Sequence, residues 1–293
     1  MGDARSVLPF YAQCKFYFYF FAAISSNGTA ISQHNELGNI NQEFYLWPTV
    51  TKAAQNAIDM RYRLLDYFYT AFHQQHIEGT PVVSPLWFKY PSDPNTFPID
   101  LQFLFGDSIL VSPVTQENAT SVTIYLPNDI FYDFLTFQPV HGAGSNITLD
   151  NVNFTSIPVH IRGGVVLPLR IEGAMTTKAL RSNDFELIVA PGLDGTATGS
   201  LYVDDGVSIS PASSTTVTMN FSDAKLTVNG TFDYATGVKV AQVRFLNVAK
   251  APRQVTVDDK VVALSSFNYD GNKILQVNLG FQFSQSFSVS YVV

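Results

Sequence analysis

Two patterns of apolar and polar positions divide the chain. Between residues 51 and 77, apolar side chains recur every three or four positions, which is the spacing of one face of an α-helix. Gly79 and Pro81 follow, and both residue types end helices. The pattern predicts one long helix or two abutting helices. Asp66, in the middle, is a candidate N-cap for the second helix.

This helical segment is apolar on nearly all of its faces. Its aromatic residues are Tyr62, Tyr67, Phe68, Tyr69 and Phe72. A helix that is apolar all round needs burial on several sides. We therefore expect the segment to lack cover within this chain and to make the whole chain associate, whereas residues 80–293 alone should be soluble and monomeric.

From residue 81 onward the pattern changes to short apolar or alternating runs separated by Pro, Gly, Asn and Asp. They include PVVSPLWF, SILVSPV, SVTIYLP, IPVHIRGGVVLPL, FELIVAP, SLYVDDG, TVTMNF, KVAQVRFLNV and SFSVSYVV. Many short strands at intervals of about 8 to 12 residues are typical of antiparallel β-sandwiches. A polar stretch with few β-formers at residues 169–179 predicts a boundary between two such domains. The fold class expected is mainly β, with two consecutive antiparallel β-sandwiches preceded by a short helical portion.

Composition narrows the class of partner. The chain has 293 residues, of which 46% are hydrophobic and 14% charged, so a packed core is expected. Its formal net charge is -7 and it contains no run of Lys or Arg, which argues against a nucleic-acid partner. An acidic, polar surface suits a neutral ligand such as a sugar.

Six sequons indicate a secretory origin. They begin at Asn27, Asn118, Asn146, Asn153, Asn220 and Asn229. The apolar residues 16–24 have the length of a signal-peptide core and are too short to span a bilayer, so no membrane anchor is expected. Asp3 and Pro9 upstream of them are unlike a signal, and the matching myristoylation pattern at residues 1–6 conflicts with the sequons. The single Cys14 excludes an internal disulfide.

Few residues suggest chemistry on their own. His73 and His76 lie three apart on the helix, but no third ligand is near, and no metal or cofactor is expected. Asp204 and Asp205 precede Gly206, which favours a turn over a calcium loop.

The order and wording of several runs resemble the C-terminal part of family 31 glycoside hydrolases, the α-glucosidase-like enzymes. The runs are HNE at 34–36, QEFYLWPTV at 42–50, RYRLLDYFYTAF at 61–72, GTPVVSPLWFKYPSDPNT at 79–96, QFLFGDSILVSPV at 102–114, IPVHIRGGVVLPL at 157–169 and GSLYVDDGVS at 199–208. The resemblance implies that residues 34–78 end a (β/α)8 catalytic barrel. It further implies a proximal β-sandwich at 79–172 and a distal one at 173–293, whereas residues 1–33 do not match the family pattern.

The same resemblance implies that both catalytic carboxylates are missing. Retaining glycosidases need a carboxylate nucleophile and a carboxylic acid about 5 to 5.5 Å apart. In this family the two Asp residues lie in WxDMNE-like and GDN runs, and neither run occurs in this chain. Adjacent Asp204 and Asp205 on a strand would point to opposite faces, and Glu36 and Glu43 lie in a loop. No catalytic residue is therefore expected.

His34 is the one substrate-binding residue that the resemblance implies, as the His of the family's RxHN run, which hydrogen-bonds the innermost sugar. The family's Arg two positions earlier is Ser32 here, so a loop His without a role is the alternative. Other departures are Asp66 where the family has Pro, Ser84 where it has Arg and Phe131 where it has Trp. Residues 1–33 are either translated from unrelated sequence or divergent.

Three functions remain open. The first is a portion of a secreted retaining hydrolase whose complete form acts on terminal α-linked glucose or xylose in oligosaccharides. The second is an accessory carbohydrate-binding β-sandwich protein. The third is an inert product of a truncated gene. Because the residues that select the sugar lie in the missing barrel, the sequence does not separate glucose from xylose. In the first function the chain is expected to be inactive alone, and an extracellular or secretory-pathway location is expected for it.

Overall fold

A computed structural model describes residues 44–116, 119–153, 155 and 157–293. The helices are η1 Phe44–Leu46, α2 Pro48–Arg63, α3 Leu65–Glu78, α4 Leu86–Lys89, η2 Pro94–Thr96, α5 Thr177–Leu180 and η3 Leu264–Ser266. The first strands are β1 Val83–Pro85, β2 Phe103–Phe105, β3 Ile109–Val111, β4 Ser121–Leu126, β5 Ile130–Asp133, β6 Pro139–His141, β7 Ser145–Asp150, β8 Val159–Arg162 and β9 Val165–Arg170. The others are β10 Phe185–Ala190, β11 Ala197–Val203, β12 Thr215–Ser222, β13 Lys225–Phe232, β14 Lys239–Phe245, β15 Gln254–Val257, β16 Lys260–Val261, β17 Phe267–Tyr269, β18 Leu275–Gln282 and β19 Phe287–Val292. None of the helices in these ranges is long and apolar enough to cross a membrane.

The predicted helical segment forms two helices that abut at Leu64. The backbone of Leu64 leaves the helical region and serves as both the C-cap of α2 and the N-cap of α3. Asp66 is therefore not the N-cap, and the prediction that its side chain caps the second helix is wrong. Gly79 ends α3 with a left-handed backbone at φ 77°, a conformation that glycine adopts without steric cost.

The proximal β-sandwich packs a six-stranded sheet against a two-stranded one. The larger sheet has the order β1-β2-β3-β8-β5-β6, and β4 pairs with β7 in the smaller. Their facing side chains form one apolar cluster that includes Leu104, Leu110, Ile124 and Phe131. Strands β2 and β3 of the six-stranded sheet are buried on both faces, because Leu104 and Leu110 face the two-stranded sheet while Phe105 and Ile109 belong to a separate apolar cluster on the other side.

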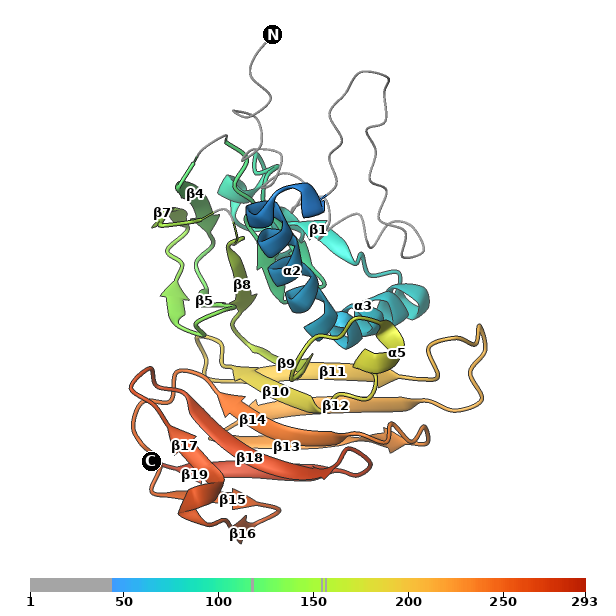
Figure 1. The fold of residues 1–293 in the computed structure, drawn as a ribbon. Helices are drawn as coiled ribbons and strands as arrows, with labels where there is room; N and C mark the ends of the chain where they lie inside the picture. The colour runs from blue at the N-terminus through green and yellow to red at the C-terminus, as the bar shows by residue number, and fades with distance from the viewer. Residues whose placement is uncertain (1–43, 117–118, 154, 156) are drawn as a thin grey trace.

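The distal β-sandwich is built from eleven strands in one hydrogen-bonded order, β16-β15-β19-β13-β12-β11-β9-β10-β14-β18-β17. Its two halves lie as stacked layers in Figure 1 and enclose a second apolar cluster, to which Leu201, Val217, Val243 and Val277 belong. Most of its pairs are antiparallel, as expected, but β10 pairs with β14 and β11 pairs with β9 in parallel.

The run IPVHIRGGVVLPL carries the chain from one sandwich to the other. Strand β8 belongs to the six-stranded sheet, and β9 belongs to the eleven-stranded sheet. Gly163 and Gly164 make the step between them: Gly164 has φ 84°, and a Cβ on Gly163 would lie 2.4 Å from a methyl group of Ile130. The proximal range expected from the sequence, 79–172, thus includes β9, which pairs with the distal sheet. All six residues of β9 are buried because helices cover one of its faces and the distal core the other.

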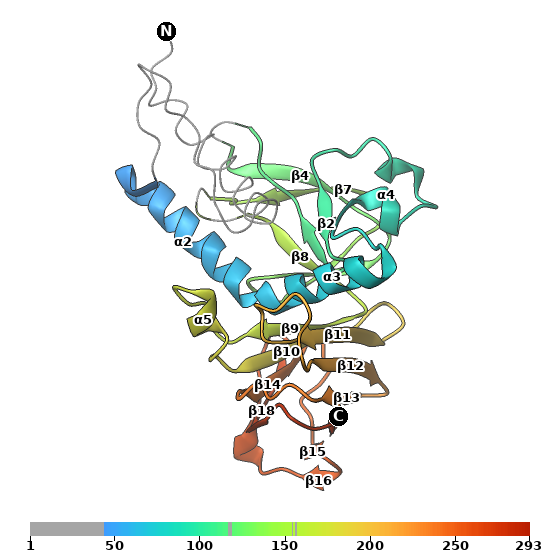
Figure 2. The same cartoon turned by 90° about the vertical axis from the view of Figure 1, so that its right-hand side faces the viewer.

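The helical segment packs across this junction rather than standing apart from it. In Figures 1 and 2, α2 and α3 lie beside the proximal sheet and over β9 and β11. A third apolar cluster combines Leu64 and Phe68 with Phe105, Leu167 and Ile188. The expectation that the segment lacks cover is therefore wrong, because its inner face is buried by both sandwiches. Its outer face remains open at Ile58 and Ile77, which are 42% and 59% exposed.

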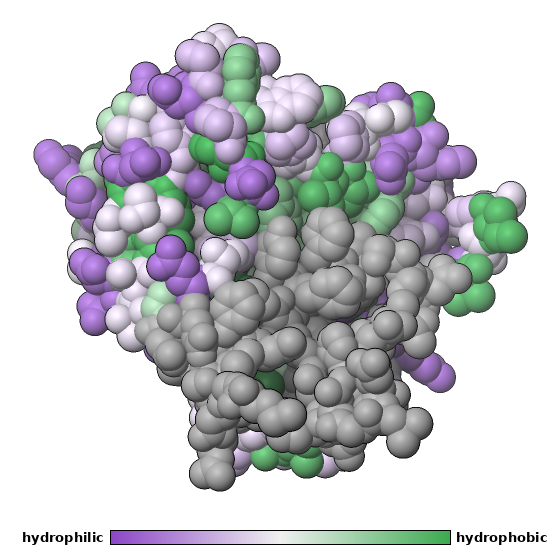
Figure 3. Space-filling view, turned by 90° about the horizontal axis from the view of Figure 1, so that it is seen from above, coloured by the Kyte–Doolittle hydropathy of each residue, from purple (hydrophilic) through white to green (hydrophobic). Residues whose placement is uncertain are grey.

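Apolar side chains also reach the surface elsewhere. Seen from above, they appear at several separate places among hydrophilic ones (Figure 3). Tyr45, Trp87, Phe88 and Phe97 are among the exposed ones. Exposed single apolar residues are normal for folded proteins, whereas contiguous patches mark interfaces.

Candidate functional site

A buried ion pair locks the helical segment to the distal sheet. Arg170, at the end of β9, donates from Nε to Asp66 Oδ2 at 2.7 Å and from Nη2 to Asp66 Oδ1 at 2.8 Å. Arg170 also donates to the carbonyl of Asn183, and its guanidinium lies 3.8 Å from the centre of the Phe185 ring. The bidentate geometry fixes the angle of α3 on the sheet as well as its position.

A second buried carboxylate, Glu186, accepts two hydrogen bonds and has a further cation close by. Glu186 is 1% exposed on β10. Arg63 donates to its Oε1 at 2.5 Å and Gln242 to its Oε2 at 2.8 Å, while Nε of Arg244 lies 3.3 Å from Oε2. A buried carboxylate needs such partners, because an unpaired charge in the interior is costly. Both ends of the break at Leu64 are thus tied to the distal sandwich.

The DDG run at 204–206 follows β11 and holds two carboxylates with separate partners. Buried Asp204 accepts from the hydroxyl of Tyr69 at 2.9 Å and from the amide of Gly206 at 2.7 Å. Burial, followed by this hydrogen bond to Asp204, raises the pKa of Tyr69 to about 12. Asp205 instead accepts from the amides of Val207 and Ser208. The run thus begins the long connection from β11 to β12 as a bend, and the two acids bind different partners.

The two helical histidines have different surroundings. The ring of His73 stacks on Tyr202 of β11, with centroids 3.6 Å apart and planes 8° apart, whereas His76 is exposed. Burial lowers the pKa of His73. Among the described residues, no group of three His, Cys, Asp or Glu side chains could hold a metal ion. His73 thus serves as a packing partner that joins α3 to the distal sandwich.

Several residues predicted from the sequence lie outside the described ranges. These are His34, the acids Glu36 and Glu43, and the sequon residues Asn27 and Asn118. The other four sequon residues are described and all are exposed: Asn146 on β7, Asn153 in the loop after it, Asn220 on β12 and Asn229 on β13. In the sequon of Asn153, the backbone amide and the hydroxyl of Thr155 both donate hydrogen bonds to the side-chain oxygen of Asn153.

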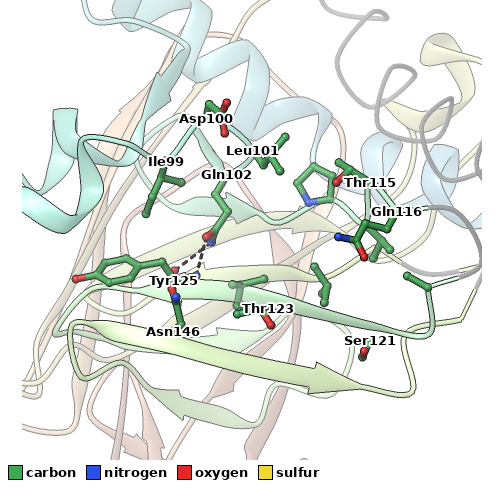
Figure 4. A pocket seen from close by; sticks show the side chains of 15 residues that line it. Ile99, Asp100, Leu101, Gln102, Thr115, Gln116, Ser121, Thr123, Tyr125 and Asn146 are labelled. Atoms are coloured by element: carbon green, nitrogen blue, oxygen red, sulfur yellow. Dashed lines mark hydrogen bonds between the residues drawn. The ribbon is translucent and has the colours of Figure 1, made fainter.

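A groove of about 420 Å³ runs along β4 in the proximal sandwich. Figure 4 shows β4 on one side, with Tyr125, Thr123 and Ser121, and two loops on the other, with Ile99 to Gln102 and Thr115 to Gln116. The buried amide of Gln102 is fully used: its Nε2 donates to Ser112 Oγ and the carbonyl of Tyr125, and its Oε1 accepts from the amide of Tyr125. That amide holds the loop at 99–102 in place above the strand.

The groove is lined mainly by uncharged polar and apolar side chains. Its side chains include the hydroxyls of Thr115, Ser121 and Thr123 and the amides of Gln116 and Asn146, and among the described residues that line it Asp100 alone is charged. None of those described residues is Lys or Arg, so the groove does not suit an anion. Its volume falls within the range of small-molecule sites, about 300 to 1,000 Å³.

Sequence reasoning missed the ion pairs and the groove. Arg170 ends a continuous apolar run and Glu186 lies within the strand FELIVA, so each was a charged residue inside a buried pattern. That signal predicts a buried partner without saying which one. The groove gave no such signal, since its residues come from four separate segments.

The described residues thus form a helical segment that packs against two β-sandwiches and is joined to the distal one by buried ion pairs, without a catalytic carboxylate pair among the acids considered above. This is the arrangement expected for the C-terminal end of a barrel-containing glycoside hydrolase.

Comparison with known families and proteins agrees. Residues 24–71 match the "Glycosyl hydrolases family 31 TIM-barrel domain" and residues 79–167 match the "Glycosyl hydrolase family 31 C-terminal domain". The first match begins at residue 24. The sequence motifs place the start of the resemblance ten residues later, at His34. The chain is 46% identical over 258 residues to the "Probable alpha/beta-glucosidase" of Aspergillus flavus, covering 88% of this chain and 29% of that protein. It is also 36% identical over 250 residues to the "Alpha-glucosidase" of Schizosaccharomyces pombe, covering 84% and 26%. The chain therefore corresponds to the C-terminal part of a family 31 glycoside hydrolase of the α-glucosidase-like group.

Solved structures share the fold. The α subunit of glucosidase II superposes with a TM-score of 0.81 at 25% identity, covering 98% of this chain and 33% of that one. A family 31 dextranase from Flavobacterium johnsoniae superposes with a TM-score of 0.77 at 19% identity, covering 100% and 38%, and this likeness shows the fold alone. The chain thus spans less than a third of the length of the curated relatives it matches.

Proposed function

We propose that this chain is the C-terminal portion of a secreted retaining hydrolase that acts on terminal α-linked glucose, and that it is inactive alone. The observation that carries the proposal is the 46% identity over 258 residues to an enzyme named as an alpha/beta-glucosidase. The missing WxDMNE and GDN runs support inactivity, because covalent and general acid catalysis need both carboxylates. The role of the chain is to cover and fix the end of the catalytic barrel.

The buried ion pairs give this role a physical basis. Asp66 lies on the helical segment, within the match to the barrel domain, and Arg170 lies on the distal sheet. A barrel joined through this segment is held at one angle to both sandwiches. Catalytic side chains must be held to within fractions of an ångström, so a rigid attachment of this kind supports activity from a distance.

The test uses the whole chain and a chimera. The purified chain should release aryl alcohol from an aryl α-glucoside at the rate of buffer alone. A chimera in which this chain replaces the matching C-terminal part of the Aspergillus flavus relative should hydrolyse the same substrate, and the relative without that part should not. Turnover by the chain alone that is lost when one of its acids is replaced would contradict the proposal. So would a folded chimera with no activity.

The secretory location and the glycosylation of the chain are part of the same proposal. The exposure of Asn146, Asn153, Asn220 and Asn229 supports it, because each could carry a glycan without disturbing the core. The test is the intact mass of the chain expressed from its own N-terminus in a fungal host. A mass without glycans, from a chain retained in the cytosol, would contradict it.

The accessory carbohydrate-binding function is favoured by one observation, the neutral polar groove along β4. Titration of the unglycosylated chain with maltotriose separates this function from that of an inert product. Saturable binding that is lost in Gln116→Ala would support it.

A further inference from the structure

One sequon lies at the groove. Asn146 of β7 pairs in register with Tyr125 of β4, and both residues line the groove. Figure 4 shows the Asn146 side chain directly below Tyr125 at one end of the groove. The side-chain amide of Asn146 makes no hydrogen bond within the described part of the chain, and the residue is exposed. Asn146 is thus free to be modified, and a group attached to it starts at the groove.

The groove suits the chemistry of an attached sugar. N-linked glycans begin with neutral N-acetylhexosamine units that carry hydroxyl and amide groups and present apolar C–H faces. Thr115, Gln116 and Ser121 offer hydroxyl and amide groups along the groove, and Ile99 and Val122 offer apolar surface. The side chains of Gln116 and Ser121 have no hydrogen-bond partner within the described ranges, so both are available to a ligand.

Tethering makes the attached glycan the favoured occupant. A covalently linked ligand faces its site at an effective concentration of about millimolar or higher, so even weak contacts are occupied. We propose that the groove along β4 holds the N-linked glycan of Asn146, which covers the loops at 99–102 and 113–116. This inference rests on the secretory route proposed above.

Asn229 provides a matched control within the same chain. It lies on the outer face of β13, where its register partner on β12 is Thr218. The neighbouring outward residues Asn220 and Thr227 are also short and polar. A glycan on Asn229 would therefore extend over a face of the distal sheet. None of these four residues lines the groove along β4.

The experiment combines glycan mapping with a double-mutant cycle. The whole chain is secreted from a eukaryotic host with an added signal peptide, and occupancy at each sequon is read from peptide masses after enzymatic deglycosylation in heavy-oxygen water. Thermal midpoints are then measured for the parent, Asn146→Gln, Gln116→Ala and the double variant, with Asn229→Gln as control.

We expect Asn146 to be occupied and Asn146→Gln to lower the midpoint by about 2 to 4 °C, whereas Asn229→Gln changes it by less than about 1 °C. Gln116→Ala should lower the midpoint in the glycosylated chain and have no effect in the Asn146→Gln background. Amide hydrogen exchange at 113–116 should be slower in the glycosylated chain.

An unmodified Asn146 beside an occupied Asn229 would overturn the inference. Additive effects of Gln116→Ala and Asn146→Gln would also overturn it, because they would place the glycan outside the groove. Because the added signal peptide supplies entry, neither result bears on the natural route. Expression from the natural N-terminus tests that route separately, so the failures of the two proposals are distinguishable.

Discussion

Replacing Asp66 by Asn tests whether the buried ion pair holds the helical segment in place. The variant keeps the shape of the side chain but removes its charge. Arg170, which is 2% exposed, then stays buried opposite a neutral amide. Removing one partner of a buried ion pair costs about 3 to 5 kcal/mol, chiefly because the other charge is left uncompensated.

The expected loss for Asp66→Asn is about 3 kcal/mol, the lower end of that range, because the amide oxygen can still accept one hydrogen bond from Arg170. For a domain of this size, 1 kcal/mol corresponds to about 2 to 4 °C. The thermal midpoint should therefore fall by about 6 to 12 °C in calorimetry. Asp66→Leu combined with Arg170→Met should recover part of the loss, because an apolar pair avoids the cost of desolvating two charges.

The control is Asp259→Asn, which removes a surface pair. Lys225 and Asp259 are 3.2 Å apart, but their side chains are 44% and 83% exposed. Exposed pairs contribute about 0 to 1 kcal/mol, so the midpoint should barely move. If Asp66→Asn lowers the midpoint no more than Asp259→Asn does, the pair does not stabilise the attachment, and the proposed role of the helical segment loses its basis.

Three further predictions follow from the packing. Deleting residues 1–79 should destabilise the remainder and promote its association on a sizing column, because the apolar face at Phe105 and Leu167 would lose its cover; a monomer with an unchanged melt would contradict this. Burial lowers the pKa of His160, so the unfolded chain takes up its proton first as the pH falls. Stability should thus decline below about pH 6.5, by at most about 1.4 kcal/mol per pH unit for this proton, and urea unfolding at pH 7 and pH 5.5 should show a smaller decline in His160→Gln. Gly106→Ala should lower the free energy of unfolding by several kcal/mol, roughly as much as the most destabilising single substitutions do. Gly106 has φ 60°, and a Cβ there would lie 2.0 Å from the Tyr67 hydroxyl oxygen. A fall in the urea midpoint smaller than that of Asp259→Asn would contradict this prediction.

Local patterns in the sequence predicted most of the secondary structure. The apolar spacing at 51–77 predicted a helical segment closed by Gly79 and Pro81, and α3 ends at Glu78 with Gly79 as its C-cap. The run TVTMNF at 216–221 predicted a strand, and β12 spans it with buried and exposed residues alternating at every position. These features depend on neighbours within a few residues, and the periods of helix and strand are written directly into the sequence.

The same local reasoning was wrong about Asp66. A short acceptor near a helix break is a good N-cap candidate. Its actual partner, Arg170, is 104 positions away and reaches it only because β9 passes beneath α3. Glu186 and Arg63 are likewise 123 positions apart. Such a pairing depends on how sheets and helices stack, which no local pattern encodes.

The family resemblance said more about the function of the chain than the chemistry of its single residues did. It supplied the family, which the comparisons bear out, and the expectation that both carboxylates are missing. The roles of His34 and of the sequons stay predictions, since His34 lies outside the described residues and the exposure of an Asn does not prove its modification.

The sequence by itself determined the long helical segment and its end before Gly79, most of the strands and the family that the chain resembles, because each follows from periodicity, helix-ending residues or wording along the chain. It was wrong about Leu86 to Phe88, which lie in the run PVVSPLWF that was expected to be extended but form part of the short helix α4. Only the tertiary structure decided that β9 belongs with the distal sheet, that the helical segment is covered by both sandwiches and that Asn146 lies at a groove. Those properties arise where segments distant in the chain meet. The contacts are selected by burial of apolar faces and pairing of buried charges, which depend on the whole fold.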